Sequence, residues 1–155
     1  MIKIVKAEEQ HIPEICKLWL EFMYFHRDID YIFTPRDGAV VGFEEEMVRR
    51  LMKFEDGLVL IALDGEQVVA YSLSEIRSSK GLKLEKFGAI DHVAVTASYR
   101  RRGVGEKMVS EILKWFKSRN IERVELEVLT KNPIGYSFWK KHGFTDYRHR
   151  LYRRI

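Results

Sequence analysis

An arginine-rich turn with two glycines is the part of this sequence whose residue types are best suited to binding an anion. Residues 98–108 read SYRRRGVGEKM, so three arginines lead directly into Gly-Val-Gly. Guanidinium groups are forked donors that match phosphate oxygens, and glycine lacks the Cβ atom that would keep a ligand away from the main chain. If a helix begins here, its first N–H groups are free to bind an anion. The stretch therefore predicts a phosphate or pyrophosphate site.

The turn taken alone also has a less specific interpretation. Many strand-to-helix turns contain glycine, and arginines before a helix often lie in solvent, so an ordinary basic turn stays open as an alternative. A Walker loop is excluded because no Lys-Ser or Lys-Thr follows the glycines. A dinucleotide fingerprint is disfavoured because Met108 stands where its third glycine is required.

Hydrophobic patterns predict the elements that position this turn. Alternating β-rich segments predict strands, with Asp64-Gly65 as a hairpin turn, and apolar residues at helical spacing predict helices. The order β-α-α-β-β-β-α-β-α-β predicts one α/β (α+β) domain over residues 1–155, with a mixed, mostly antiparallel, twisted sheet and helices on both faces. The predicted strands are 2–5, 58–76 (the hairpin), 85–95, 124–129 and 144–154, the helices are 12–23, 43–54, 103–119 and 132–143, and residues 27–42 are expected to be irregular.

Composition excludes several classes of protein. The chain has 155 residues, of which 46% are hydrophobic and 32% are charged, and its net charge is +4 at pH 7; this is typical of a soluble domain. Cys16 is the only cysteine, so an internal disulfide and a cysteine-rich zinc site are excluded, and we expect no metal. Neither a signal-peptide pattern nor an apolar run of about 20 residues occurs, so we expect a cytoplasmic protein that does not enter a membrane.

Two motifs at a suitable separation resemble those of the GNAT superfamily of N-acetyltransferases. The pattern Arg100-x-x-Gly103-x-Gly105 after the predicted strand AIDHVAV is similar to the family's acyl-CoA motif, Gln/Arg-x-x-Gly-x-Gly/Ala. The segment NPIGYSFWKKHGF, residues 132–144, resembles the family's Asn-x-x-Ala-x-x-x-Tyr-x-x-x-Gly-Phe, with Gly135 at the alanine and Trp139 at the tyrosine. The motifs cover residues 89–144, and the element order extends the likeness to the whole chain, loosely at residues 27–56.

The resemblance implies an acetyltransferase that uses acetyl-CoA. It implies that the pyrophosphate binds the backbone of the arginine-glycine turn and that the pantetheine arm pairs like an added strand with residues 93–95. It also implies direct transfer of acetyl to a primary amine of a small molecule or a protein, without an acyl-enzyme. The residues that it places at the cofactor are Val93, Ala94, Val95, Arg100, Arg101, Arg102, Gly103, Val104, Gly105, Asn132, Tyr136 and Trp139.

Direct transfer needs a base for the amine and donors for the developing oxyanion. On a regular strand Asp91 shares a face with Val93 and Val95, which makes Asp91 the leading candidate for the base. His92 on the opposite face is a second candidate, because its ordinary pKa is near neutrality. Glu127 on the next strand is a third. The alternative for Asp91 is a polar strand residue paired with a basic neighbour.

The leaving thiolate is the other group to consider. Tyr136 is the candidate acid, since Trp139 carries an indole N–H that is no comparable source of protons. Alternatively no acid is needed, because a thiol with a pKa near 8.5 is a tolerable leaving group. Tyr136 and Trp139 also remain candidates for plain packing against the cofactor or the core.

Aromatic residues crowd the end of the first predicted helix and the loop after it. Part of this group belongs to the core. The rest, with the carboxylates nearby, predict a pocket for a cationic amine. The alternative is that these carboxylates simply form a solvated helix face. The candidate acceptor-binding residues are Phe22, Tyr24, Phe25, His26, Tyr31 and Glu127.

Two other function classes remain open. Trp139 at the tyrosine position is compatible with a non-catalytic acyl-CoA-binding module or sensor. The tail arginines, together with the turn, are compatible with a nucleic-acid binder, but no helix-turn-helix or aromatic-basic RNA motif accompanies them, so we expect no nucleic-acid partner. We expect a monomer or a homodimer. The tail arginines are Arg148, Arg150, Arg153 and Arg154.

Overall fold

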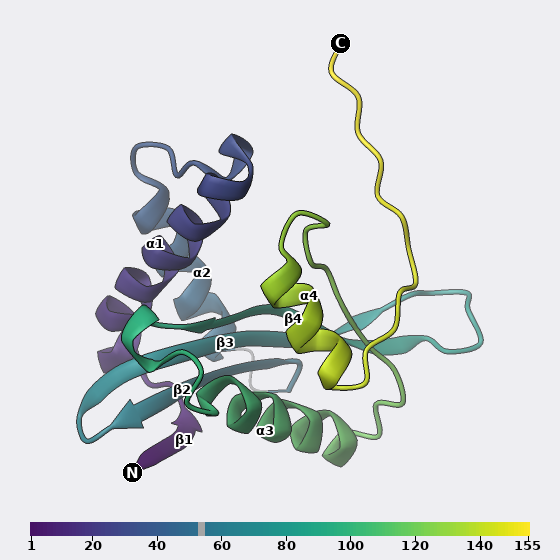
Figure 1. Ribbon diagram of the computed structural model, residues 1–155. Helices are drawn as coiled ribbons and strands as arrows, with labels where there is room; N and C mark the ends of the chain where they lie inside the picture. Colours follow the sequence, from purple (N-terminus) through teal and green to yellow (C-terminus); the bar gives the residue numbers. More distant parts are fainter. Residues whose placement is uncertain (53–54) are drawn as a thin grey trace.

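A five-stranded mixed sheet forms the centre of the protein in a computed structural model, which describes residues 1–52 and 55–155. The strands lie in the order of the chain; the first four are antiparallel and the last pair is parallel. This sheet, with helices on both faces, confirms the predicted fold class (Figure 1). The strands are β1 (Ile2–Lys6), β2 (Gly57–Asp64), β3 (Gln67–Ser78), β4 (Lys86–Val95) and β5 (Val124–Leu126).

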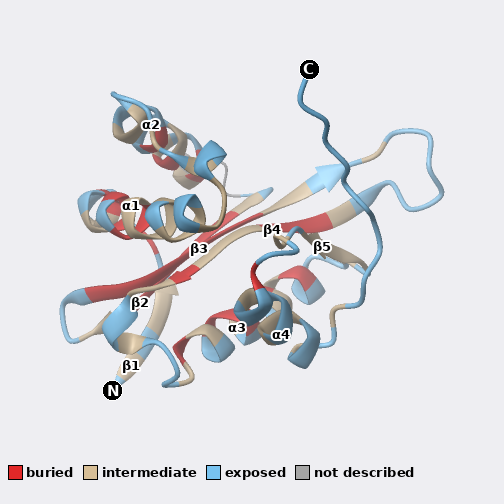
Figure 2. Ribbon diagram, turned by 45° about the horizontal axis from the view of Figure 1, so that its top comes forward, coloured by how far each residue is buried: buried red, intermediate tan, exposed pale blue. Residues whose placement is uncertain are grey.

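In the described part of the chain, four α-helices cover the two faces of the sheet (Figure 2). Helices α1 (Ile12–Ile29) and α2 (Ala39–Met52) pack on one face, where Tyr71 of β3 is fully buried. Helix α3 (Val104–Ser118) packs on the other face, with α4 (Pro133–Lys141) beside it. Residues 104, 108, 112 and 116 of α3 step by four and are all buried, as the helical spacing predicts.

Strand β4 contains a bulge at the centre of the sheet. Leu73 pairs with His92 and Ser74 pairs with Ile90, so Asp91 is an extra residue without a partner on β3. The extra residue turns both Asp91 and His92 toward α1 and α2, whereas residues 93 and 95 pack on the α3 side. The prediction that Asp91 shares a face with residues 93 and 95 while His92 lies opposite was therefore wrong, because a bulge interrupts the alternation of a strand.

Several predicted boundaries also change. Helix α1 continues to Ile29 and α2 begins at Ala39, so part of the segment expected to be irregular is helical. The predicted end of that second helix, residues 53–54, lies outside the described residues. Strand β5 stops at Leu126 rather than at residue 129.

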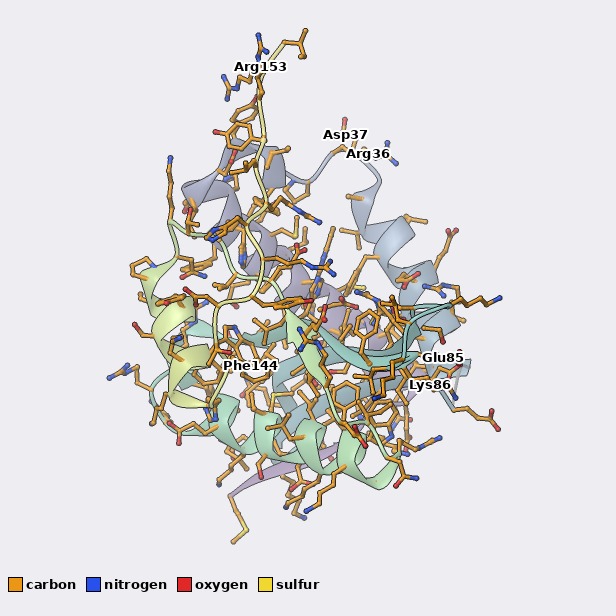
Figure 3. All side chains as sticks on the ribbon, turned by 90° about the vertical axis from the view of Figure 1, so that its right-hand side faces the viewer. Arg36, Asp37, Glu85, Lys86, Phe144 and Arg153 are labelled. Atoms are coloured by element: carbon orange, nitrogen blue, oxygen red, sulfur yellow. The ribbon has the colours of Figure 1, made fainter. Side chains whose placement is uncertain are left out.

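The predicted last strand, residues 144–154, is absent. The tail is extended and exposed, and within the described chain it pairs with no strand. Phe144 at its start still packs on Trp139, whereas Arg153 lies far from the sheet (Figure 3). Alternation alone predicted the strand incorrectly, because the tail's many basic residues offer no continuous apolar face to bury and a strand is stable only beside a neighbour.

Gly88 allows β4 and α3 to pack closely. A Cβ atom at Gly88 would lie 2.5 Å from the ring of Phe116, which is 1% exposed. We expect Gly88→Ala to lower the free energy of unfolding by about 1–3 kcal/mol, because the buried ring has little room to move. Gly42→Ala is the matched control: it lies in α2 with open space around its Cβ position, and should raise stability by about 0.5–1 kcal/mol. Denaturant unfolding measures both, and equal effects of the two changes would contradict the packing argument.

Candidate active site

The turn after β4 presents main-chain N–H groups to solvent. Arg101 has φ 62° and Gly103 has φ 76°, both left-handed, and α3 begins at the next residue. None of the N–H groups of residues 101–105 meets an acceptor in the described part of the chain. A Cβ atom at Gly103 would meet nothing within 4 Å. Unpaired N–H groups in such a turn, ahead of a helix, are typical of backbone anion sites, so the turn fits a pyrophosphate.

Gly105, unlike Gly103, is closely surrounded by other side chains. A Cβ atom at Gly105 would lie 3.3 Å from the ring of Phe138 in α4 and 3.8 Å from the side chain of Val95. The missing side chain therefore brings α4 close to the start of α3. Only Gly103 keeps the open approach that the sequence predicted for both glycines.

Arg100 anchors the turn to the body of the domain. Its Nε donates to the carbonyl oxygen of Val95 at 2.9 Å, and its Nη2 lies 3.3 Å from a carboxylate oxygen of Glu21 in α1. Glu21 also accepts from the Thr96 hydroxyl and the Ala97 N–H, both at 2.8 Å. The sequence motif did not indicate Glu21, since its partners lie more than 70 positions away.

The other two arginines of the turn remain at the surface. Arg101 and Arg102 are exposed, and the guanidinium of Arg102 lies 5.2 Å from the centre of the Tyr99 ring. Their positive charge therefore surrounds the free N–H groups without blocking them.

One edge of β4 is open just before this turn. Strand β5 pairs with β4 only through residues 88–90, while β3 follows β4 on the other side as far as Val95. Between Asp91 and Val95 no described strand occupies the β5 side of β4. This edge includes the predicted residues 93–95 and can accept an extended chain as an added strand.

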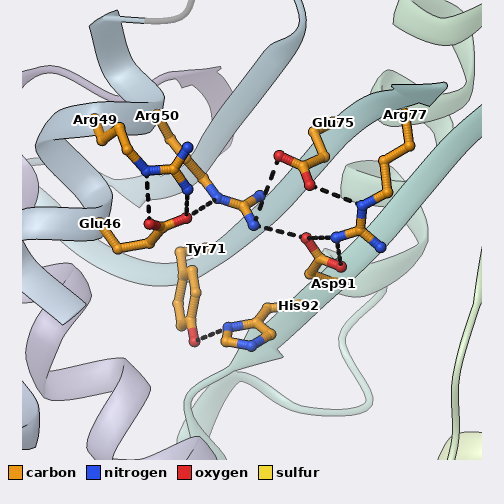
Figure 4. Close-up of polar contacts among 8 residues, drawn as sticks. All are labelled: Glu46, Arg49, Arg50, Tyr71, Glu75, Arg77, Asp91 and His92. Carbon is orange, nitrogen blue, oxygen red and sulfur yellow. Dashed lines mark hydrogen bonds and ion pairs between the residues drawn. The ribbon is translucent and has the colours of Figure 1, made fainter. Parts of the chain in front are cut away.

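Asp91 lies in a network of carboxylates and guanidinium groups (Figure 4). Its Oδ2 is 2.8 Å from Nη2 of Arg50, and its Oδ1 and Oδ2 are 2.8 and 3.0 Å from Nη2 of Arg77. Glu75 accepts from Arg77 at 2.8 Å, and Glu46 accepts from Nε of Arg50 at 2.9 Å. The base role of Asp91 stays a prediction, but both of its oxygens already accept hydrogen bonds from arginines, as the structural alternative requires.

Burial and hydrogen bonds act in opposite directions on this network. Burial alone would lower the pKa of Arg50, but its hydrogen bonds to Asp91 and Glu46 outweigh burial and raise it. The pKa of Glu46 is lowered, chiefly by its hydrogen bond to Arg49 and further by Arg50, against an opposing effect of burial. Arg50 and Glu46 therefore stay charged at neutral pH, and the hydrogen bond from Arg50 to Asp91 joins α2 to the bulge of β4.

His92, next to Asp91, is surrounded by aromatic rings. Its Nδ1 lies 3.0 Å from the hydroxyl oxygen of Tyr71, and its ring centre is 4.7 Å from that of Phe22 and 6.4 Å from that of Phe43. Burial lowers the pKa of His92 to about 4, so the imidazole is neutral at pH 7. Burial also raises the pKa of Tyr71 well above its ordinary value, so its phenol keeps its proton.

The predicted residues of α4 have mixed surroundings. The side chain of Asn132 is buried and accepts from the Gly135 N–H at 3.0 Å, which makes it the N-cap of the helix. Trp139 packs with the core cluster beneath α3, against Phe144. The Tyr136 hydroxyl donates to the carboxylate of Asp146 at 3.1 Å. The cofactor roles of Asn132, Tyr136 and Trp139 stay predictions.

Only part of the predicted acceptor set comes together. His26, whose Nδ1 lies 2.8 Å from the carbonyl oxygen of Phe22, contacts the rings of Phe22 and Phe25, and Phe22 contacts His92. The remaining three predicted residues lie apart from this cluster in exposed positions: Tyr24 beside Arg27, Tyr31 beneath Arg154, and Glu127 paired with Arg150 at 3.1 Å.

The Tyr136 hydroxyl offers a direct test of the predicted acid. We expect Tyr136→Phe to lower the maximal rate of acetyl transfer by much less than the roughly 100-fold that loss of a general acid causes, because the Tyr136 hydroxyl already donates its hydrogen bond to Asp146. Steady-state rates from pH 6 to 9 measure this. A loss of about 100-fold in Tyr136→Phe, with activity retained in Asp146→Asn, would instead assign the acid role to Tyr136.

Residues 1–52 and 55–155 lack two further kinds of feature. Within these residues no group of three or more His, Cys, Asp or Glu side chains is arranged to hold a metal ion. No helix in the described chain combines the length and the hydrophobicity that crossing a membrane requires.

Comparisons with known proteins agree with this geometry. Residues 5–144 match the model of the acetyltransferase (GNAT) family. The chain is 26% identical over 153 residues to N-alpha-acetyltransferase 30 of Schizosaccharomyces pombe, covering 99% of this chain and 89% of that protein.

Two solved structures share the fold. A tetramutant of the BH1408 protein from Bacillus halodurans has a TM-score of 0.87 at 19% identity, covering 99% of both chains. A protein of Clostridium acetobutylicum, described as a predicted acetyltransferase with acetyl-CoA, has a TM-score of 0.78 at 18% identity, covering 99% of this chain and 96% of that one.

Proposed function

The chain belongs to the acetyltransferase (GNAT) family, and we propose that it transfers an acetyl group from acetyl-CoA to a primary amine by direct attack. One observation carries this proposal: the free N–H groups of the turn at Gly103 directly follow the open edge of β4. A phosphate-binding turn that continues into an unpaired strand edge suits a ligand with a pyrophosphate and an amide-containing arm.

The residues of the turn and the strand share the binding of acetyl-CoA. The N–H groups of residues 101–105 receive the pyrophosphate, with Arg101 and Arg102 adding charge at the surface. The main chain of residues 93–95 receives the arm. The bound molecule supplies the activated acetyl group, and the bulge at Asp91 and His92 lies where the reacting end is held.

The surroundings of Cys16 support direct attack. Cys16 is the only cysteine and lies buried in α1, where burial raises the pKa of its thiol. A buried, protonated thiol is a poor nucleophile. An acyl-cysteine is therefore disfavoured, and the acceptor amine itself forms the new bond.

We propose that the acceptor is the N-terminal amine of a peptide. The similarity to N-alpha-acetyltransferase 30 over almost the whole chain supports this class. The aromatic cluster of Phe22, Phe25 and His26 lies on the acceptor side of the bulge, next to His92. Such a cluster suits the apolar side chain of a first residue.

Thiol release from acetyl-CoA tests the activity and the acceptor class together. Lysine-free peptides with a free N-terminus are compared with the same peptides already acetylated there, and with spermidine and an aminoglycoside. We expect release only with free peptide N-termini, and mass spectrometry should find one added acetyl group at that amine. Release only with the small amines would overturn the acceptor class while retaining the activity.

A non-catalytic acyl-CoA-binding module is the alternative. It predicts acetyl-CoA binding without thiol release for any of these amines. The same screen therefore separates the two functions, provided that calorimetry shows binding. The oligomeric state, a monomer or a homodimer, stays a prediction.

A further inference from the structure

The hydrogen bond between Tyr71 and His92 joins two side chains that are both neutral at pH 7. Tyr71 is fully buried, and its hydroxyl has no partner in the described chain other than Nδ1 of His92, at 3.0 Å. The bond has two possible directions, and they give His92 opposite chemistry. Either the phenol donates to Nδ1, or Nδ1–H donates to the phenol oxygen.

The burial of Tyr71 selects one direction. If Nδ1–H donated, the phenol proton would be left without an acceptor in a fully buried position, which is costly. If the phenol donates, both groups are satisfied. Nδ1 then carries the lone pair, and the proton of the neutral imidazole lies on the other ring nitrogen, Nε2.

The position of Nε2 makes that proton available to a ligand. Within the described chain, the buried polar side-chain atoms without a partner are Nη1 of Arg50, the hydroxyls of Ser72 and Ser74, and Nε2 of His142. Nε2 of His92 is not among these atoms although it has no partner in the described chain, so it keeps some exposure to solvent. Figure 4 shows the ring with Nδ1 toward Tyr71 and Nε2 on the side away from the Asp91 network.

His92 is also held where the acetyl group must lie. It follows the bulge, beyond Ile90, the last residue of β4 that pairs with β5. In the proposed binding mode, the arm of acetyl-CoA starts at the turn, follows residues 95 to 93 and ends beside His92. The rings of Phe22 and Phe43 hold the imidazole from the α1 and α2 side.

We propose that His92 is a hydrogen-bond donor in acetyl transfer, with Nε2–H directed at the carbonyl oxygen of the thioester, and that Tyr71 fixes this tautomer. The inference rests on the proposed acetyl-CoA activity. It differs from the base role for which a histidine at this position is the obvious candidate. A base needs a free lone pair on the open nitrogen, and the tautomer fixed by Tyr71 places a proton there.

The transfer balances without a change of protonation at His92. The neutral amine nitrogen forms a bond to the acetyl carbon, and the carbon–sulfur bond breaks. The nitrogen loses one proton and the departing thiolate takes up one proton. Negative charge grows on the carbonyl oxygen as the new bond forms. A fixed neutral donor stabilises that charge and keeps its own proton.

The ¹⁵N shifts of the histidine ring in the full chain, without ligand, test the tautomer. The five histidines are separated by comparing the spectrum with that of His92→Gln. We expect Nε2 of His92 to show the protonated shift and Nδ1 the unprotonated one from pH 6 to 8. Tyr71→Phe should populate the other tautomer. A protonated Nδ1 in the natural protein overturns the proposal, whether or not the chain transfers acetyl groups.

Rates with acetyl-CoA and a free-N-terminus peptide test the donor role. His92→Gln, which keeps an N–H donor, should lose up to about fivefold, whereas His92→Phe, which keeps only the ring, should lose about 100-fold. The groups whose charge bears on His92 are Asp91, Arg50 and His26, so the pH profile is recorded for both variants. Equally large losses of rate in both variants, with a shift in the acid limb of the pH–rate profile, would indicate that His92 is a base and would overturn the proposal. Absence of thiol release in the natural protein would overturn the proposed function, while the NMR result would still decide the tautomer.

Discussion

Gly103→Asp is expected to weaken acetyl-CoA binding by at least 100-fold. Gly103 has open space at its Cβ position and lies among the free N–H groups of the turn, so a carboxylate there faces the pyrophosphate. Two like charges about 4 Å apart near a protein surface repel by roughly 4 kcal/mol. A 100-fold loss corresponds to about 2.8 kcal/mol, so one such contact is sufficient. Calorimetric titration with acetyl-CoA measures the loss.

Two controls separate the effect of the new charge at position 103 from backbone strain and from the effect of an added carboxylate elsewhere on the surface. Gly103→Asn has nearly the same shape and tolerates the left-handed conformation as well as aspartate does, but carries no charge. Gly81→Asp places the same side chain at φ 86° in the open β3–β4 loop. We expect Gly103→Asn to bind far better than Gly103→Asp, and Gly81→Asp to bind normally. Equal affinity of Gly103→Asp and the natural chain would place the phosphates elsewhere.

The fold and the turn were predictable because their signals are local. Asp64-Gly65 marks its hairpin to within one residue, since β2 ends at Asp64 and the loop is Gly65-Glu66. The apolar spacing of α3 falls within one helix. The arginine-glycine motif likewise depends on six consecutive residues. Local propensity and spacing determine such features, so the sequence alone specifies them.

The surroundings of the site depend on contacts between distant residues. Arg50 meets Asp91 across 41 positions, and Arg100 meets Glu21 across 79. Neither pair leaves a pattern in the sequence, since one arginine among many exposed ones looks the same before folding. The bulge is similar: nothing in AIDHVAV distinguishes a regular strand from one with an extra residue, yet the extra residue decides which way Asp91 points.

Arg50→Met is expected to lower the free energy of unfolding by about 3–5 kcal/mol. Arg50 is 9% exposed and lies 2.8 Å from Asp91, 2.9 Å from Glu46 and 3.9 Å from Glu75. Removing its charge leaves these carboxylates partly buried with fewer partners, and loss of one member of a buried ion pair typically has this cost. Methionine fills much of the same volume, so the loss reports the charge rather than a cavity. Urea unfolding followed by circular dichroism measures it.

Arg49→Met is the matched control, because it is the same change one residue earlier on the same helix. Arg49 is exposed and, among the described residues, forms its ion pair with Glu46, so we expect no measurable loss of stability. The pH dependence adds a second check. The pKa of Glu46 is lowered in the folded protein, chiefly by Arg49 and further by Arg50. The part of that stabilisation that Glu46 shares with Arg50 is therefore present above the ordinary pKa of 4.5 and is lost as the pH falls through the lowered pKa. The difference between the natural protein and Arg50→Met should therefore shrink in acid. Equal losses for the two arginine variants at pH 7 would mean that the Asp91 network is a solvent-screened surface cluster, and that the bulge is held by the strand pairing of β3 and β4 alone.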